Sequence, residues 1–461
     1  HSTSRRQRQM CIRDRPSPDE AGAVELGRQL LSRARVLLSA GRYPDAGRTT
    51  AEARIQLEPV SFAPVRAELA FTESAHHRFE GRFPEAVERL RRALSHATRA
   101  RRFDLMADTM MDLVFTLGTR MQRYDEIRPY RDLIEGMVEP GTLRDAKYRR
   151  LLGMVLRSDG QLDEAELQLR SALKTLREVQ GEDSLNLAPV EEALAGVLYM
   201  RGDFEESLVL SRGALEVGVR ERGDDHPDVA ASRTNVAATL AALGRHKEAE
   251  VALRRAISTW EETAGPGYFG IGLARHTLAS SLVEQGDLEG GISEQRKALE
   301  IHTRAVGEQH SDTLQLRTAL AQMEFQRGNP AQAERMIRDV LEIQTKKLGV
   351  DDIAVAQTRH ELAGFLFARG ALADARLLAE QVWARAQVEP GSEQLTASSG
   401  FLLVQTLWNE PSAHGRARAI ARQAYEVARS EQLDELAELE TWLRDHGALE
   451  SGGDPGTRHA G

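Results

Sequence analysis

Glycine recurs at a fixed interval through the middle of this 461-residue chain. One series stands 42 residues apart, at Gly160, Gly202, Gly244, Gly286, Gly328 and Gly370. A second series with the same spacing falls midway between the first, at Gly181, Gly223, Gly265, Gly307, Gly349 and Gly391. A glycine every 21 residues does not arise by chance in a chain with 37 glycines, so the sequence predicts a repeat architecture.

A spacing of 21 residues fits one helix of about 14 residues followed by a turn. Glycine just past a helix end adopts a left-handed conformation that caps the last carbonyl groups without a Cβ clash. We therefore expect each glycine to end a helix, and each 42-residue unit to be a pair of antiparallel helices. Gly244, in "LGRHKEA", stands alone between helical segments, so it is not the start of a phosphate-binding loop.

The positions between the glycines carry matching columns of apolar and small residues. In the first helix of each unit an apolar residue precedes a small one, as in Leu194–Ala195 and Leu278–Ala279. In the second helix small residues stand seven apart, as in Ala249 and Ala256. This spacing places one apolar stripe on each helix and small residues where two helices cross.

These columns resemble tetratricopeptide repeats. The 42-residue period and "GDDHPDV" (Gly223 to Val229) resemble the kinesin light chain type of this repeat, and His310 stands where His226 does. The other linkers, "GPGYFG", "GVDDIA" and "GEDSLN", depart from that pattern. The resemblance implies an all-α fold, a right-handed superhelical solenoid of antiparallel helix pairs.

The chain divides into five expected segments. Residues 1–15, which include Cys11 and "MCIRDR", resemble translated adapter sequence, so we expect a non-native leader and a natural start that is missing. Residues 16–159 are expected to form irregular helix pairs, because "GRYPDA", "GRFPEA" and the degenerate "QRYDEI" repeat one turn. Residues 160–391 hold the regular repeats, 392–446 a decaying repeat and a capping helix, and 447–461 a flexible tail. About ten helix pairs are expected.

Composition restricts the compartment and the partner. The net charge of -9 argues against nucleic acid, which requires a concentrated basic surface. No apolar run is long enough for a membrane helix, and no signal peptide is present, so we expect a cytoplasmic protein that does not bind membranes.

Motifs that carry chemistry are missing from the sequence. There is no Walker sequence, no nucleophile elbow, no kinase signature and no paired cysteine, and "HELAG" at His360 lacks a second histidine. The neighbours His76 and His77 point in different directions on a helix, so we expect solvated histidines there. We predict no catalytic residue, no metal and no cofactor.

One arginine column stands out on the first helices. Arg233, Arg275, Arg317 and Arg359 are spaced at 42, with Arg149 in the same register and Glu191 breaking the series. They bind acidic side chains or a carboxylate of a partner, or they pack their stems as a hydrophobic residue would and pair with carboxylates of the chain. The second interpretation is the ordinary expectation. One position further stand Thr234, His276, Thr318 and His360, which the resemblance places nearer the concave face.

Two functions remain open from the sequence. The first is a non-catalytic scaffold that binds a peptide or protein partner, acidic in character if the arginines take part, in the concave groove. The alternative is the sensor or docking region of a larger bacterial signalling protein, a serine/threonine kinase whose catalytic domain precedes this chain. The sequence does not indicate the oligomeric state.

Overall fold

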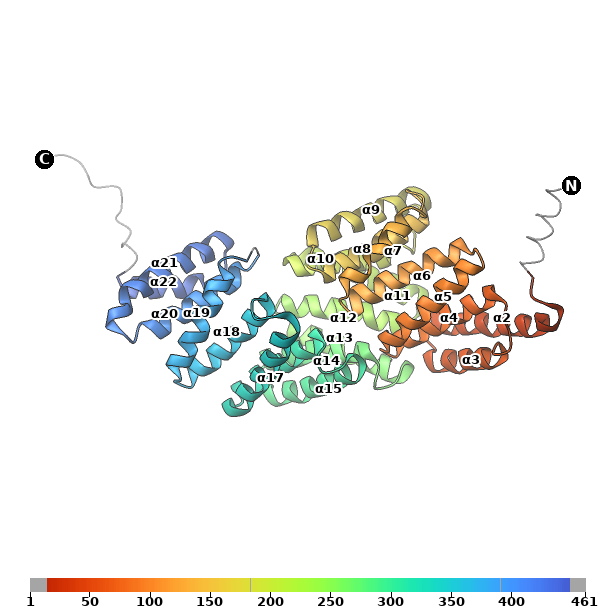
Figure 1. The fold of residues 1–461 in the computed structure, drawn as a ribbon. Coiled ribbons are helices and arrows are strands. Elements are labelled where there is room, and N and C mark those ends of the chain that lie inside the picture. The colour runs from red at the N-terminus through yellow and green to blue at the C-terminus, as the bar shows by residue number, and fades with distance from the viewer. Residues whose placement is uncertain (1–14, 183, 390, 448–461) are drawn as a thin grey trace, which may run out of the picture. The chain divides into compact units, whose positions relative to one another are not determined.

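A computed structural model describes residues 15–182, 184–389 and 391–447. Every regular element in these ranges is helical, as predicted, and within residues 15–307 and within residues 308–447 most consecutive helices pack against each other (Figure 1). The expected leader, apart from Arg15, and the tail, apart from Gly447, lie outside the described residues.

The helices follow one another with short turns. In the N-terminal part they are α2 (Pro18–Ser39), α3 (Tyr43–Gln56), α4 (Ala63–Phe79), α5 (Phe83–Arg99), α6 (Phe103–Phe115), α7 (Arg128–Glu135), α8 (Leu143–Ser158) and α9 (Leu162–Gln180). The next are α10 (Ala188–Arg201), α11 (Phe204–Arg222), α12 (Pro227–Ala242), α13 (His246–Thr263), α14 (Phe269–Glu284) and α15 (Leu288–Val306). The last are α16 (Ser311–Gln326), α17 (Pro330–Leu348), α18 (Ile353–Ala368), α19 (Leu372–Ala386), α20 (Glu393–Leu407), α21 (His414–Glu431) and α22 (Leu436–Asp445).

Two compact units make up the chain, His1–Gly307 and Glu308–Gly461. The first unit holds the described helices α2 to α15, and the second holds α16 to α22. The boundary falls on Gly307, one of the periodic glycines, where one helix pair ends and the next begins.

All twelve periodic glycines have a positive φ, between +72° and +93°. The first series ends the first helix of each pair as expected, and the residue after each glycine donates its N–H to a carbonyl five residues earlier. One example is Arg245 to Leu240, at 2.8 Å. In the second series, the backbone conformation differs from the left-handed cap that the sequence predicts. Gly181, Gly223, Gly307 and Gly349 have ψ between 158° and 172°, a region that is essentially restricted to glycine.

The predicted columns form the core. Leu194, Leu278, Ala249 and Ala256 are all buried, with at most 2% of their surface exposed. Small residues at these crossings let paired helices approach closely, and the aliphatic residues fill the space between pairs. Each pair therefore buries its apolar stripes against its neighbours.

The repeat is irregular between α6 and α8. A π-helix, Thr116–Arg120, follows α6, and a 3-10 turn, Tyr124–Glu126, precedes the short α7. Gln122 takes a φ of 54° at the position where a regular pair has its glycine. The predicted degenerate copy of the turn is present here, with a non-glycine residue in the left-handed region.

Helix pairs that are distant in sequence are in contact within the first unit. Tyr43 at the start of α3 stacks on Tyr268 before α14, with ring centroids 6.2 Å apart. Phe83 at the start of α5 meets Phe269 edge to face at 5.7 Å. A simple solenoid has contacts only between neighbouring repeats, so these contacts add a closure that the periodic pattern does not contain.

Polar and backbone contacts support the same closure. The Nδ1 atom of His226 accepts the N–H of Asp228 at 3.1 Å and caps α12, so its Nε2–H donates to the carbonyl of Ser39, also at 3.1 Å. Gly41 packs against the ring of Pro227 so closely that a Cβ atom would overlap it. The turn between α2 and α3 is thus fitted to the first turn of α12. We call this set of contacts the closure.

The last described helix, α22, packs on the preceding helices of the second unit. Leu439 and Leu443 of α22 are fully buried, and Trp442 meets Trp408 edge to face at 5.0 Å. The turn before α22 places Gln432 at a φ of 55°. This helix begins at Leu436, after α21 has ended at Glu431.

Candidate functional site

Two adjoining hollows lie along the first helices α8, α10 and α12. One, of about 560 Å³, lies among α10, α11 and α12; the other, of about 340 Å³, lies among α8, α9 and α10. They share Asn186 and Pro189 at the start of α10. We call the two together the α8–α12 groove.

The walls of the larger hollow are mainly apolar, and its rim is charged. The apolar lining residues are Leu185, Ala188, Pro189, Ala214, Val217, Val229 and Ala231. On the rim, Asp228 is paired with Arg222. A hollow of this kind accepts an apolar side chain and leaves polar groups at its edge for orientation.

Two arginines on α8 have no carboxylate partner. Arg150 lines the smaller hollow, and its one hydrogen bond is to the sulfur of Met154, at 3.5 Å. Arg157 has no hydrogen bond or ion pair to any residue that the structure describes, and its guanidinium lies directly against Gly196 of α10.

Burial acts on both of these arginines. It lowers the pKa of Arg150, and it lowers the pKa of Arg157, to which the positive charge of Arg120 adds. The negative charge of Glu192 acts on both pKa values in the opposite direction, but neither guanidinium forms an ion pair with it. A buried guanidinium with no carboxylate in hydrogen-bond contact favours the binding of one.

Glu192 of α10 is the acidic group of the groove. Its Oε1 accepts a hydrogen bond from the amide of Asn235 on α12, at 2.7 Å. Burial raises the pKa of Glu192 above its ordinary value, although this hydrogen bond and Arg150 act in the opposite direction. The groove thus carries an acidic group on α10 and one basic group on α8, Arg150, that forms no ion pair; Arg157 lies two turns further along α8 and lines neither hollow.

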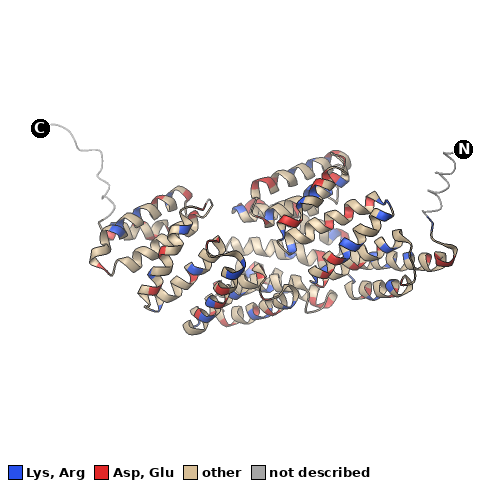
Figure 2. Cartoon of the chain, viewed as in Figure 1, with Lys and Arg blue, Asp and Glu red and all other residues tan. Residues whose placement is uncertain are grey.

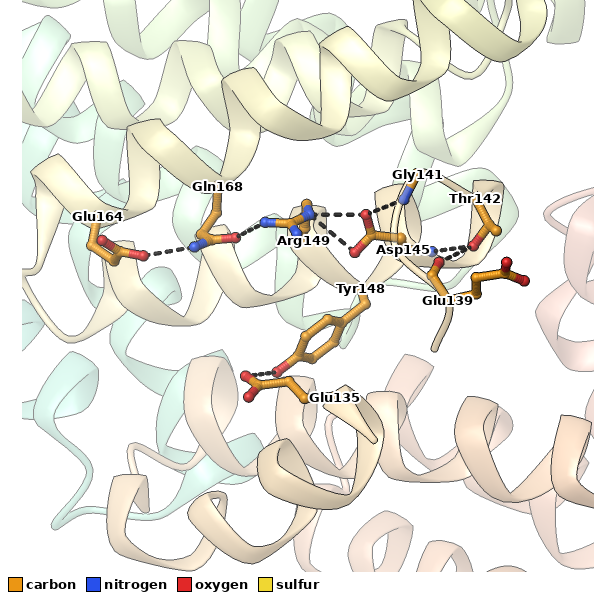
Figure 3. Close-up of polar contacts among 9 residues, drawn as sticks. All are labelled: Glu135, Glu139, Gly141, Thr142, Asp145, Tyr148, Arg149, Glu164 and Gln168. Atoms are coloured by element: carbon orange, nitrogen blue, oxygen red, sulfur yellow. Dashed lines mark hydrogen bonds and ion pairs between the residues drawn. The ribbon is translucent and has the colours of Figure 1, made fainter. Parts of the chain in front are cut away.

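The arginine column pairs with the chain's own groups in the first unit. Arg149 donates from Nε to both carboxylate oxygens of Asp145, at 3.0 Å, and from Nη1 to Gln168 of α9, at 3.0 Å (Figure 3). Arg275 on α14 pairs with Glu261 of α13, at 2.6 Å, and with Glu294 of α15. Both arginines tie a first helix to a second helix.

Arg233 is the most buried member, with 8% of its surface exposed, and it pairs with Asp224 at 2.5 Å. In the second unit, Arg359 donates to the carbonyl of Val350, at 2.9 Å. Arg317 is half-buried and has no hydrogen bond or ion pair among the described residues. The geometry of Arg149, Arg233 and Arg275 supports a packing role, and Arg317 is the member whose head is free.

The neighbouring column is mostly turned toward the chain itself. Thr234 is 3% exposed, and its hydroxyl donates to the carbonyl of Ala230, at 2.9 Å. His276 donates from Nδ1 to Gln295, at 2.9 Å. Burial lowers the pKa of His360, whose Nδ1 has no hydrogen-bond partner among the described residues. Thr318 is half-buried, with no side-chain hydrogen bond in the described part.

Two groove residues belong to a column that the sequence analysis followed only in part. Glu192 stands 42 residues before Thr234, and Arg150 stands 42 residues before Glu192. Continuing the register of the Thr/His column toward the N-terminus would have found both. The column is hard to recognise in the sequence because the residue type at this register position changes from one repeat to the next.

Family comparisons match the part of the chain that carries the period. Two models described as tetratricopeptide repeat match, one at residues 186–262 and 271–346, the other at 146–186 and 355–388. These are tetratricopeptide repeats. The resemblance stated from the glycine and alanine columns is confirmed. Neither matching model describes a catalytic domain or a kinase, so the kinase context stays a prediction.

Solved structures of similar fold include other proteins with such repeats. The TPR-like repeats of a kinesin light chain from Podosopora anserina are 21% identical, with 45% of this chain and 100% of that chain covered and a TM-score of 0.40. BtubC from P. vanneervenii is 19% identical, with coverage of 50% and 92% and a TM-score of 0.42. The quorum sensor NprR from B. thuringiensis is 15% identical, with coverage of 74% and 98% and a TM-score of 0.47. No curated protein matches the sequence.

The described residues offer neither a metal site nor a membrane-spanning helix. They hold no group of three or more histidine, cysteine or carboxylate side chains placed to bind a metal ion. None of their helices combines the length and the apolar character that crossing a membrane requires.

Proposed function

We propose that this tetratricopeptide-repeat chain is a non-catalytic scaffold that holds a segment of another protein in the α8–α12 groove. Acidic side chains of that segment bind Arg150 and Arg157. The observation that carries the proposal is the pair of half-buried arginines on α8 that form no ion pair with a carboxylate of the described residues. Arginine binds carboxylates in a bidentate geometry, which supplies both affinity and orientation.

The dimensions of the groove favour an extended segment. Packed helices lie roughly 10 Å apart, and an extended chain rises about 3.3 Å per residue, so about three residues cover each helix. A segment of roughly six to nine residues therefore reaches from α8 to α12. Its apolar side chain occupies the larger hollow, and its acidic side chains lie over α8.

Of the arginine column, only one member takes part in the proposed partner binding. Arg233 and Arg275 hold carboxylates of the chain, so their heads are not free for a partner. Arg317 keeps a free head in the second unit and is the member that contributes to partner binding.

The test uses the full chain as bait, followed by affinity measurement with each purified partner. Reversal of Arg150 and Arg157 to glutamate is expected to weaken binding by about tenfold or more, since one charge-assisted hydrogen bond contributes about 1.5–3 kcal/mol. Arg304→Glu, on the exposed side of α15, is the matched control and leaves the affinity unchanged. A purified partner that binds the double reversal as tightly as the natural chain contradicts the proposal.

A further inference from the structure

Three consecutive second helices carry the same pattern on their exposed side. In α9, α11 and α13 a glutamate, an aliphatic residue and an arginine follow one another at intervals of three. The three sets are Glu164–Leu167–Arg170, Glu206–Val209–Arg212 and Glu248–Val251–Arg254. We call these nine residues the outer stripe.

The aliphatic residues of the stripe are unusually exposed. Leu167 is 60% exposed, Val209 71% and Val251 72%. All six charged residues of the stripe are exposed as well. Single exposed aliphatic residues are ordinary, but three at one register position of adjoining helices form a repeated surface feature.

Among the second helices α9 to α19 the complete pattern occurs only in these three; α19 keeps an acidic and an exposed aliphatic residue, Asp374 and Leu377, but has Glu380 in place of the arginine. The same positions of α15 hold Gly290, Ser293 and Arg296, and those of α17 hold Gln332, Arg335 and Arg338. The outer stripe is therefore not a requirement of the helix pair, since the repeat forms without it. It lies on helices other than the first helices that line most of the α8–α12 groove.

We propose that the outer stripe is an interface with a second copy of this chain, in which the second helices of the two copies cross antiparallel. The order glutamate, aliphatic, arginine becomes arginine, aliphatic, glutamate when the helix direction is reversed. A two-fold axis that lies in the interface and runs across the three helices, perpendicular to their axes, reverses the helix direction. It therefore places each glutamate opposite an arginine and each aliphatic residue against another. With the helices parallel, like charges meet, so charge selects the antiparallel arrangement.

The charged residues of the stripe form ion pairs at the protein surface. The ion pairs between stripe residues are long, 3.6 Å from Arg170 to Glu206 and 3.8 Å from Arg212 to Glu248. Shorter pairs join stripe residues to neighbours outside the stripe: Arg170 to Glu166 at 2.6 Å, Arg254 to Glu250 at 2.9 Å, and Glu248 to Arg245 at 2.7 Å. Exposed pairs of this kind contribute little to stability, and exchanging them for pairs across an interface costs little. Acidic and basic residues are interspersed along the described helices (Figure 2).

The available area suits a dimer. The helices α9, α11 and α13 have 18 or 19 residues each. They are therefore about 28 Å long, and three helices side by side, each about 10 Å wide, present roughly 800 Å². A contact that covers the whole outer side of the three helices, with the stripe at its centre, would equal the share of one partner in an interface of standard size, about 800 Å².

The test measures the mass of the full chain in solution by light scattering after size exclusion, at about 100 µM, where an association with a Kd below that value is visible. One variant changes Glu164, Glu206 and Glu248 to arginine, and a second changes Arg170, Arg212 and Arg254 to glutamate. Each variant alone is expected to be a monomer, because its own stripes repel. An equimolar mixture is expected to form the heterodimer, because the opposite charges then face each other.

Each outcome decides for or against the proposal. A dimer of the natural chain, two monomeric variants and a restored heterodimer support it. The control variant, with Arg335 and Arg338 changed to glutamate at the same positions of α17, stays dimeric. A monomeric natural chain, a dimer that both triple variants keep, or a mixture that stays monomeric overturns it. No partner protein is needed, so this result is independent of the α8–α12 groove.

Discussion

The closure between distant helix pairs yields a sharp prediction through one matched pair of glycines. Gly41 and Gly160 each end the first helix of a pair, with φ of +71° and +78°. In both turns the following residue donates to a carbonyl five residues back, at 2.9 Å. A Cβ at Gly160 would meet no atom within 4 Å, whereas a Cβ at Gly41 would overlap the ring of Pro227.

The cost of alanine can be divided into a shared part and a part specific to the closure. A left-handed alanine costs roughly 1–2 kcal/mol, and the reduced entropy of the unfolded chain returns about half of that. Both variants therefore lose about 1 kcal/mol. Gly41→Ala loses an additional 1–3 kcal/mol, about the cost of inserting a methyl group into a packed site.

Hydrogen exchange of the full chain locates this additional loss. We expect amides of α2 and α3 to exchange about tenfold faster or more in Gly41→Ala, because each 1.4 kcal/mol is a factor of ten in an opening equilibrium. In Gly160→Ala the increase is confined to α8 and α9. Equal exchange of α2 and α3 in the two variants would refute the closure as a stabilising contact.

Three further predictions concern charge and backbone. Arg275→Glu is expected to lower the free energy of unfolding by about 2 kcal/mol, because it leaves Glu261 and the well-buried Glu294 with a third acidic group. Arg317→Glu is expected to change the free energy of unfolding by less than about 0.5 kcal/mol. Equal losses for the Arg275 and Arg317 variants in denaturant titrations would contradict the different roles given to these two arginines. Glu192→Gln is expected to raise the melting temperature at neutral pH, because burial raises the pKa of Glu192 and the folded state then carries the cost of its charge. The folded state holds this proton more tightly, so the advantage disappears as the pH falls toward the ordinary glutamate pKa of about 4.3, and a constant advantage is the opposing result. Gly223→Ala, at φ 87° and ψ 158°, is expected to cost about 1–3 kcal/mol, measured by urea unfolding, and a neutral change argues against the glycine-only conformation.

The fold of the regular repeats could be predicted from the sequence because its constraints are local. Gly202 and Gly244 mark helix ends, and Ala249 is small because two helices cross there. The distinct conformation of Gly181 could not be predicted, because both glycine series require a positive φ and only the ψ angle separates them.

The candidate site was less accessible to sequence reasoning. The column of Arg233 and Arg275 is conspicuous because the residue type repeats, yet repetition here reflects ion pairs inside the chain. Arg150 and Arg157 differ from their counterparts in later repeats, and their lack of carboxylates depends on three-dimensional surroundings. The closure could not be predicted for the same reason, because no period in the sequence relates Tyr43 to Tyr268.

The most direct test of the central claim, that the α8–α12 groove holds the partner, is hydrogen exchange of the full chain with and without a purified partner. We predict slower exchange at the starts of α8, α10 and α12, the turns that line the two hollows. We also predict that this protection disappears when Arg150 and Arg157 are reversed. Protection that leaves these turns unchanged and falls elsewhere on the chain would contradict the account.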